Sequence, residues 1–156
     1  MAPLHFERSR TYPVDVDVAY QRTISMPLPK LFKHRYGPVP PIAEVRDQTG
    51  NWTTVGETRT IVLKGSGTMR EELAEVDRPN VFRYVLTDFT GPFKPLIDHI
   101  DGSWSFDPVG TGVRVTWAWE VHPKSGAAVP ALKAFRKAWS GSARRALEVL
   151  EGRLLR

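Results

Sequence analysis

Two segments near the C-terminus alternate strictly between apolar and polar residues, over residues 102–106 and 113–122. A period of two is typical of a β-strand with one buried face and one solvated face. The segments therefore predict two neighbouring antiparallel strands, joined by a short turn, whose aromatic face must be covered by another element. The apolar positions on this face are Trp104, Phe106, Val115, Trp117 and Trp119.

The last segment of the chain has the pattern of that cover. Its apolar residues recur at spacings of three and four, which is typical of an amphipathic helix. A helix over residues 127–155 would be about 40 Å long, enough to cross a whole sheet. The Ser140-Gly141-Ser142 sequence in its middle predicts a bend or a close approach to a neighbour. The apolar stripe comprises Leu132, Phe135, Trp139, Ala143, Ala146, Leu150 and Leu154.

The rest of the chain reads as short strands with two helical pieces near the start. Residues 6–14 predict an edge strand, and Asp15 is placed to cap a short helix. A second helical piece is expected near Leu31 and Phe32. Further strands are expected over residues 42–46, 58–64, 68–76 and 81–87, and residues 91–99 read as a connection over one end of the sheet.

These elements define an α+β fold. We expect a curved antiparallel sheet of about six to seven strands wrapped around a long C-terminal helix, with two short helices after the first strand. With 156 residues, the chain is the size of one domain, so residues 1–156 are expected to form a single unit.

A turn at residues 77–80 predicts a register for the strands on either side. Pairing across this turn places Leu73 opposite Tyr84. The same register places Glu71 opposite Leu86, so the Glu71 carboxylate shares the inner face with apolar side chains.

Glu71 is consequently a candidate general acid or base, or an anchor for a ligand hydroxyl. Burial of a carboxylate without a partner raises its pKa. The alternative is that Glu71 lies at the rim of the sheet and meets water or an arginine. The register starts from Val76 opposite Val81, and on the outer face it places Glu72 near Arg83.

The basic residues gather in the last segment. Residues 124–156 hold eight lysines and arginines against Glu148 and Glu151, a net +6, so with +5 overall the remainder carries −1. Such a helix face is either simply solvated or a surface for a partner, with Arg144 and Arg145 as its centre. We expect no nucleic-acid partner.

Several site classes find no support in the sequence. The absence of cysteine excludes disulfides and thiolate zinc sites. His5, His34 and His122 are scattered without metal-ligand spacing, so neither a metal site nor a cofactor is expected. Asp98 and His99 are adjacent and form a second candidate acid/base pair. Without an apolar leader or membrane span, we expect a cytoplasmic monomer or homodimer.

Three stretches carry a resemblance to known proteins: Asp88-Phe89-Thr90-Gly91-Pro92, Gly102-Ser103-Trp104-Ser105-Phe106 and Gly112-Val113-Arg114-Val115-Thr116-Trp117. With the order of elements, they make the chain similar to the helix-grip superfamily, also called START-like or SRPBCC. Within it, the chain resembles bacterial polyketide cyclase/dehydrase-like lipid-binding proteins.

The resemblance implies a cavity between sheet and helix that binds a hydrophobic small molecule such as a lipid, a polyketide or an aromatic metabolite. The alternatives are a polyketide cyclase or dehydratase that uses the same cavity, and an interaction module that uses the basic helix face. Fold alone does not choose between them. The expected ligand-binding residues are Leu73, Tyr84, Leu86, Trp104, Phe106, Val115, Trp117, Trp119, Phe135 and Trp139.

Overall fold

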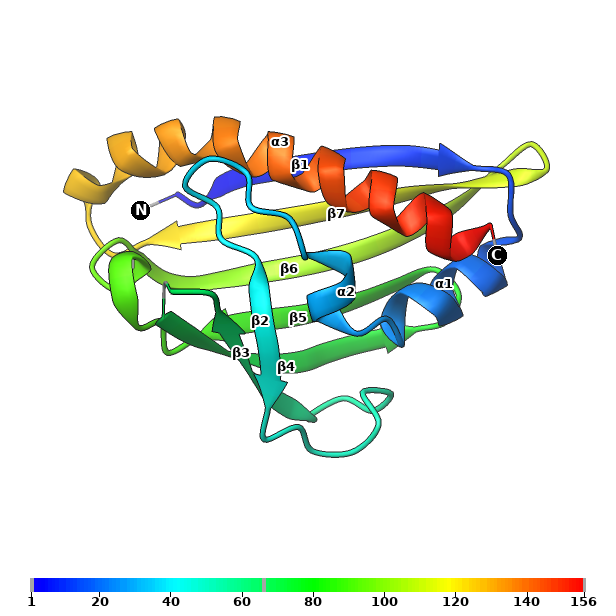
Figure 1. Ribbon diagram of the computed structural model, residues 1–156, viewed down its shortest axis with the longest axis horizontal. Coiled ribbons are helices and arrows are strands. Elements are labelled where there is room, and N and C mark those ends of the chain that lie inside the picture. Colours follow the sequence, from blue (N-terminus) through cyan, green and yellow to red (C-terminus); the bar gives the residue numbers. More distant parts are fainter. Residues whose placement is uncertain (1, 66, 156) are drawn as a thin grey trace.

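A computed structural model describes residues 2–65 and 67–155 of the protein. These residues form a seven-stranded antiparallel sheet that curves around one long helix, α3, which runs along its length (Figure 1). The predicted α+β fold is therefore confirmed. The strands are β1 (Leu4–Tyr12), β2 (Ile42–Arg46), β3 (Thr58–Leu63), β4 (Gly67–Asp77), β5 (Val81–Thr87), β6 (Ile97–Val109) and β7 (Gly112–Pro123).

The strands follow one another as a meander, except that β1 closes the far side. Their order is β1-β7-β6-β5-β4-β3-β2, so β1 is an edge strand as predicted. Two short helices, α1 (Val16–Ile24) and α2 (Leu28–Leu31), follow β1 and lie on the same side of the sheet as α3 (Figure 1). The predicted cap is also present, because the Asp15 carboxylate accepts a hydrogen bond from the Asp17 amide at 3.0 Å.

The long helix α3 spans Val129–Leu154, two residues later at its start than predicted. Pro130 lies in its first turn, where a missing backbone N–H is tolerated, and Gly126–Ala128 form a separate 3-10 turn before it. The predicted close approach in the middle of the helix is confirmed at Gly141. A Cβ atom there would lie 2.2 Å from the Tyr36 ring, so the ring in its present position packs directly against the glycine.

Residues 97–99 were expected in a connection but belong to β6. Ile97 and Ile100 are buried, which draws this segment into the sheet, and His99 pairs with His122 of β7. A register irregularity between Ile97 and His99 marks the point where the chain enters the strand.

The predicted register of β4 and β5 is correct at the inner face and wrong near the turn. Leu73 faces Tyr84 and Glu71 faces Leu86, as predicted. Val76, however, faces Phe82 rather than Val81, because β4 continues to Asp77 and a bulge between Leu73 and Glu75 takes up the extra residue.

The bulge also changes the ion pair on the outer face. Arg83 donates to the Glu75 carboxylate at 3.2 Å, and the predicted pair with Glu72 is not the one formed. Glu72 lies opposite Val85 instead.

Among the described residues, no helix is long and apolar enough to cross a membrane.

Candidate functional site

A partly open cavity lies between the concave face of the sheet and α3. Its volume is about 110 Å³, whereas a volume of about 10–15 Å³ is enough to hold a single water molecule. Side chains from β2 to β7 line it on the sheet side, and α1, α2 and α3 contribute the remaining wall. There is therefore room for a small organic molecule.

Most of the residues expected to bind a ligand lie on the wall of this cavity. They come from three strands and from α3, and all are buried except Trp119 and Phe135, which are partly buried. Their role in binding remains a prediction. The residues are Tyr84, Leu86, Trp104, Trp117, Trp119, Phe135 and Trp139.

The other three expected residues, Leu73, Phe106 and Val115, lie in the closed core outside the cavity wall. The ring of Tyr20 from α1 packs 5.3 Å from the ring of Phe106, so α1 fills this end of the concave face. Alternation placed these side chains on the correct face. It carried no information on which part of the face α1 covers.

The wall along β6, β7 and α3 consists of packed indole rings. Trp104 and Trp117 are stacked with centroids 5.4 Å apart and planes inclined by 11°. Trp139 of α3 lies 4.8 Å from Trp117 and 5.5 Å from Trp119. This aromatic wall presents flat, apolar surface to the cavity, which suits a planar or aliphatic ligand.

One hydroxyl group is held at this wall by two indoles. The Tyr84 oxygen accepts hydrogen bonds from the Nε1–H groups of Trp117 at 2.7 Å and Trp119 at 3.0 Å. Both of its acceptor sites are thereby used, which leaves the phenolic proton to be donated. Burial raises the pKa of Tyr84 above its ordinary value, so the phenol stays protonated at neutral pH.

Gly102 makes the position of Tyr84 possible. A Cβ atom on Gly102 would lie 2.2 Å from the Tyr84 ring, which covers the glycine on the neighbouring strand. A Gly102→Ala variant should therefore displace the ring and lose about 1–3 kcal/mol of stability in urea unfolding. The matched control is Gly152→Ala, where a Cβ meets nothing within 4 Å and stability should hold or rise. Equal stability of the two variants would contradict this role of Gly102.

A buried ion pair forms the second polar feature of the cavity. The Arg59 guanidinium donates to the Glu71 carboxylate at 2.5 Å, and their side chains are only 8% and 5% exposed. Arg59 also lies 3.8 Å over the ring of Trp52. Burial raises the pKa of Glu71, and the adjacent guanidinium opposes that rise. Glu71 is thus on the cavity wall as expected, but it is paired with an arginine.

Arg59 was not among the residues singled out from the sequence. The signal was present in the hairpin of β3 and β4, where Leu63 opposite Gly67 implies Arg59 opposite Glu71. Arg59 also shares the face of the buried Ile61. The register of this hairpin identifies the partner that the Glu71 carboxylate requires.

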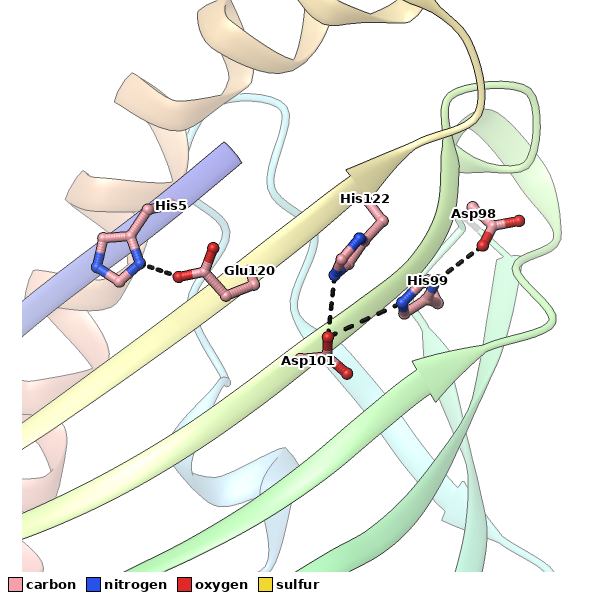
Figure 2. A network of polar contacts seen from close by, with 6 residues as sticks. All are labelled: His5, Asp98, His99, Asp101, Glu120 and His122. Carbon is pink, nitrogen blue, oxygen red and sulfur yellow. Dashed lines mark hydrogen bonds and ion pairs between the residues drawn. The ribbon is translucent and has the colours of Figure 1, made fainter. Parts of the chain in front are cut away.

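Asp98 and His99 do not reach the cavity. Their side chains join through a contact of 2.7 Å between His99 Nδ1 and Asp98 Oδ2, on the face of the sheet turned away from α3 (Figure 2). Their position gives no support to an acid/base role at the cavity. Arg144 and Arg145 are exposed on α3, and their use as an interaction surface stays a prediction.

Comparison with solved structures shows the fold. Ginseng major latex-like protein 151 from Panax ginseng superposes with a TM-score of 0.74 at 15% identity, covering 100% of both chains. Norcoclaurine synthase from Thalictrum flavum, in complex with dopamine and hydroxybenzaldehyde, has a TM-score of 0.73 at 14% identity, covering 97% of this chain and 86% of its own. A protein from Thermus thermophilus has a TM-score of 0.69 at 19% identity, covering 97% of each chain.

Sequence comparison assigns the family. We found no significant match among curated proteins. The family model described as polyketide cyclase / dehydrase and lipid transport matches residues 3–154, nearly the whole chain. The fold and the cavity are consistent with the binding of a hydrophobic ligand. The chain therefore belongs to the polyketide cyclase/dehydrase and lipid transport family, with the helix-grip fold that its sequence resembles.

Proposed function

We propose that the protein binds a small, largely apolar molecule with one hydrogen-bonding end, such as a lipid, a polyketide or an aromatic metabolite. The observation that carries the proposal is the cavity itself, whose apolar wall is interrupted by the Tyr84 hydroxyl and the Arg59–Glu71 pair. Ligand sites commonly combine an apolar wall with a few placed polar groups. The apolar part of the ligand packs against the indoles, and its polar end accepts a hydrogen bond from the Tyr84 hydroxyl.

The chemistry of the cavity wall restricts the chemical class of the ligand further. Transfer of apolar surface from water to this wall contributes about 25 cal/mol per Å². A carbonyl or hydroxyl oxygen of the ligand accepts a hydrogen bond from the Tyr84 hydroxyl, which stays protonated at neutral pH. The norcoclaurine synthase neighbour was solved with dopamine and hydroxybenzaldehyde, which supports a ligand that combines an aromatic body with polar substituents.

Binding can be measured with the fluorescent dye anilinonaphthalene sulfonate. We expect one dye per chain, with energy transfer from the indoles of the wall. A Leu86→Trp variant fills the cavity and should weaken dye binding about tenfold or more, equivalent to about 1.4 kcal/mol. The control Val55→Trp adds the same ring at an exposed position and should bind as the wild type does. Undiminished binding by a folded Leu86→Trp variant would exclude this cavity as the site.

Native mass spectrometry of the purified protein is the complementary experiment. A co-purified small molecule, lost in the Leu86→Trp variant and retained in Val55→Trp, would identify the natural ligand. Its chemical class tests the proposal directly, because a highly charged, wholly polar ligand does not fit this wall.

A second candidate function is catalysis of polyketide cyclase or dehydratase type. The observation that favours it is a carboxylate, Glu71, on the wall of an apolar cavity, with the Tyr84 phenol on the same face of the sheet. Glu71 would move a proton of the bound substrate. In that case Glu71→Gln abolishes turnover of a ligand found by mass spectrometry and largely preserves its affinity. Absence of turnover by the wild type leaves binding as the function.

A further inference from the structure

Three residues on the outer face of the sheet converge at the boundary of β6 and β7. His99 of β6 lies directly opposite His122 of β7, and their rings are stacked with centroids 3.9 Å apart. Asp101 follows two residues after His99 and points to the same face (Figure 2). The cluster lies on the side of the sheet turned away from α3 and is separate from the ligand cavity.

The spacing of the possible ligand atoms is that of a coordination sphere. Asp101 Oδ2 lies 2.9 Å from His122 Nε2 and 3.8 Å from His99 Nε2. One ligand atom from each of the three residues lies within 4.8 Å of the others. In a tetrahedral zinc site with metal–ligand bonds of about 2.0–2.1 Å, the ligand atoms are about 3.3 Å apart. The observed separations bracket this value.

Asp98 supplies the support that a ligating histidine normally has. Its Oδ2 lies 2.7 Å from His99 Nδ1, which leaves Nε2 as the ring nitrogen on the side of Asp101, 3.8 Å from Asp101 Oδ2. Metal-bound histidines commonly donate their second ring nitrogen to a carboxylate in this way. This contact is independent of the three-residue cluster and points to the same use of Nε2.

The surroundings favour a cation. Glu120 lies opposite Asp101 on β7, and it contacts His5 of β1 on the same outer face (Figure 2). The side chains of His99 and His122 are 33% and 28% exposed, so an ion can reach both. Because their rings are inclined by only 13°, binding requires each ring to tilt toward the ion, which partly exposed side chains can do.

We propose that His99, Asp101 and His122 bind one divalent transition-metal ion of the zinc class, with Asp98 as the residue that orients His99. Two imidazoles and one carboxylate select Zn²⁺, Co²⁺, Ni²⁺ or Cu²⁺ over Mg²⁺ and Ca²⁺, which prefer oxygen ligands. In a tetrahedral site, three protein ligands leave the fourth coordination position for a water molecule. The proposal departs from the sequence-based expectation of no metal site, which considered only the spacing of His5, His34 and His122 and not the pairing of His99 with His122 across β6 and β7.

The proposal is tested by calorimetric titration of ZnCl₂ into the full chain after removal of metal with a chelator. We expect one equivalent of Zn²⁺ to bind, and His99→Ala, His122→Ala and Asp101→Asn each to lose most of the affinity. Asp98→Asn should lower the affinity about tenfold. His5→Ala is the matched control, because it removes a histidine that contacts two carboxylates on the same face, and it should bind as the wild type does.

Two outcomes would overturn the site. One is wild-type affinity in His99→Ala or His122→Ala, and the other is an equal loss in His5→Ala. Circular dichroism in the presence of chelator checks that each variant is folded. A second measurement needs no variant: Zn²⁺ should shift the side-chain NMR signals of His99 and His122 and leave that of His34 in place. Unchanged His99 and His122 signals would likewise refute the proposal.

Discussion

Replacing Arg59 with methionine is expected to destabilise the protein by about 3–5 kcal/mol, because Arg59→Met leaves the Glu71 carboxylate buried without its partner. The measurement is the free energy of unfolding in urea at neutral pH. The matched control is Arg46→Met, which breaks the exposed pair with Glu44 at 2.5 Å and should cost less than about 1 kcal/mol.

A double variant separates the value of the pair from the cost of breaking it. In Arg59→Met with Glu71→Leu, no charge is left buried, so most of the lost stability should return. A double variant as unstable as Arg59→Met alone would show that lost packing, including the contact of Arg59 with Trp52, causes the effect.

The single variant should also show a dependence on pH. Without Arg59, burial acts on Glu71 unopposed and its pKa rises further above the unfolded value. A carboxyl group with a raised folded-state pKa favours the folded state while protonated and loses that contribution as the pH rises. The deficit of Arg59→Met relative to the wild type should therefore be smaller at about pH 5 than at about pH 8. A deficit that does not vary with pH would mean that the Glu71 charge is not its cause.

Truncating Trp139 to alanine is the second change with a large expected effect, about 3–5 kcal/mol of lost stability. Trp139 is 1% exposed, and it is the side chain of α3 that joins the indole wall to Phe6 of β1, 5.4 Å away. Removing it leaves a void between helix and sheet. Phe135→Ala, one turn earlier and only partly buried, should cost less.

The void left by Trp139 can be filled again from solution. Indole should bind the Trp139→Ala variant and raise its thermal midpoint, because a ligand that binds only the folded state stabilises it by mass action. The wild type should respond much less at the same indole concentration. If Trp139→Ala is no less stable than Phe135→Ala, or if indole does not raise its thermal midpoint, then α3 has moved toward the sheet and filled the void.

The fold was largely accessible from the sequence because its main elements have clear periods. The alternation in β7 and the three- and four-residue spacing in α3 required an aromatic sheet face and a helix to cover it. Local turn and cap residues determined most of the remaining boundaries. The errors include residues 97–99 and 107–109, which belong to β6, and the bulge after Leu73, where pairing with a neighbouring strand decides the backbone.

The candidate site was accessible only in part. The period of two assigned Phe106 and Trp104 to the same face, yet only Trp104 lines the cavity, because Tyr20 of α1 closes the core around Phe106. How far α1 covers the sheet depends on packing between elements distant in sequence. No local pattern contains that information.

The aromatic face and its covering helix were thus determined by the sequence alone, since burial of an apolar face requires a matching apolar partner. Tertiary structure decided what lies around them: a space against the indoles, and His99 beside His122 on the outer face. The physical reason is that periodicity specifies the direction of a side chain, whereas its neighbours are set by the register and closure of the whole sheet.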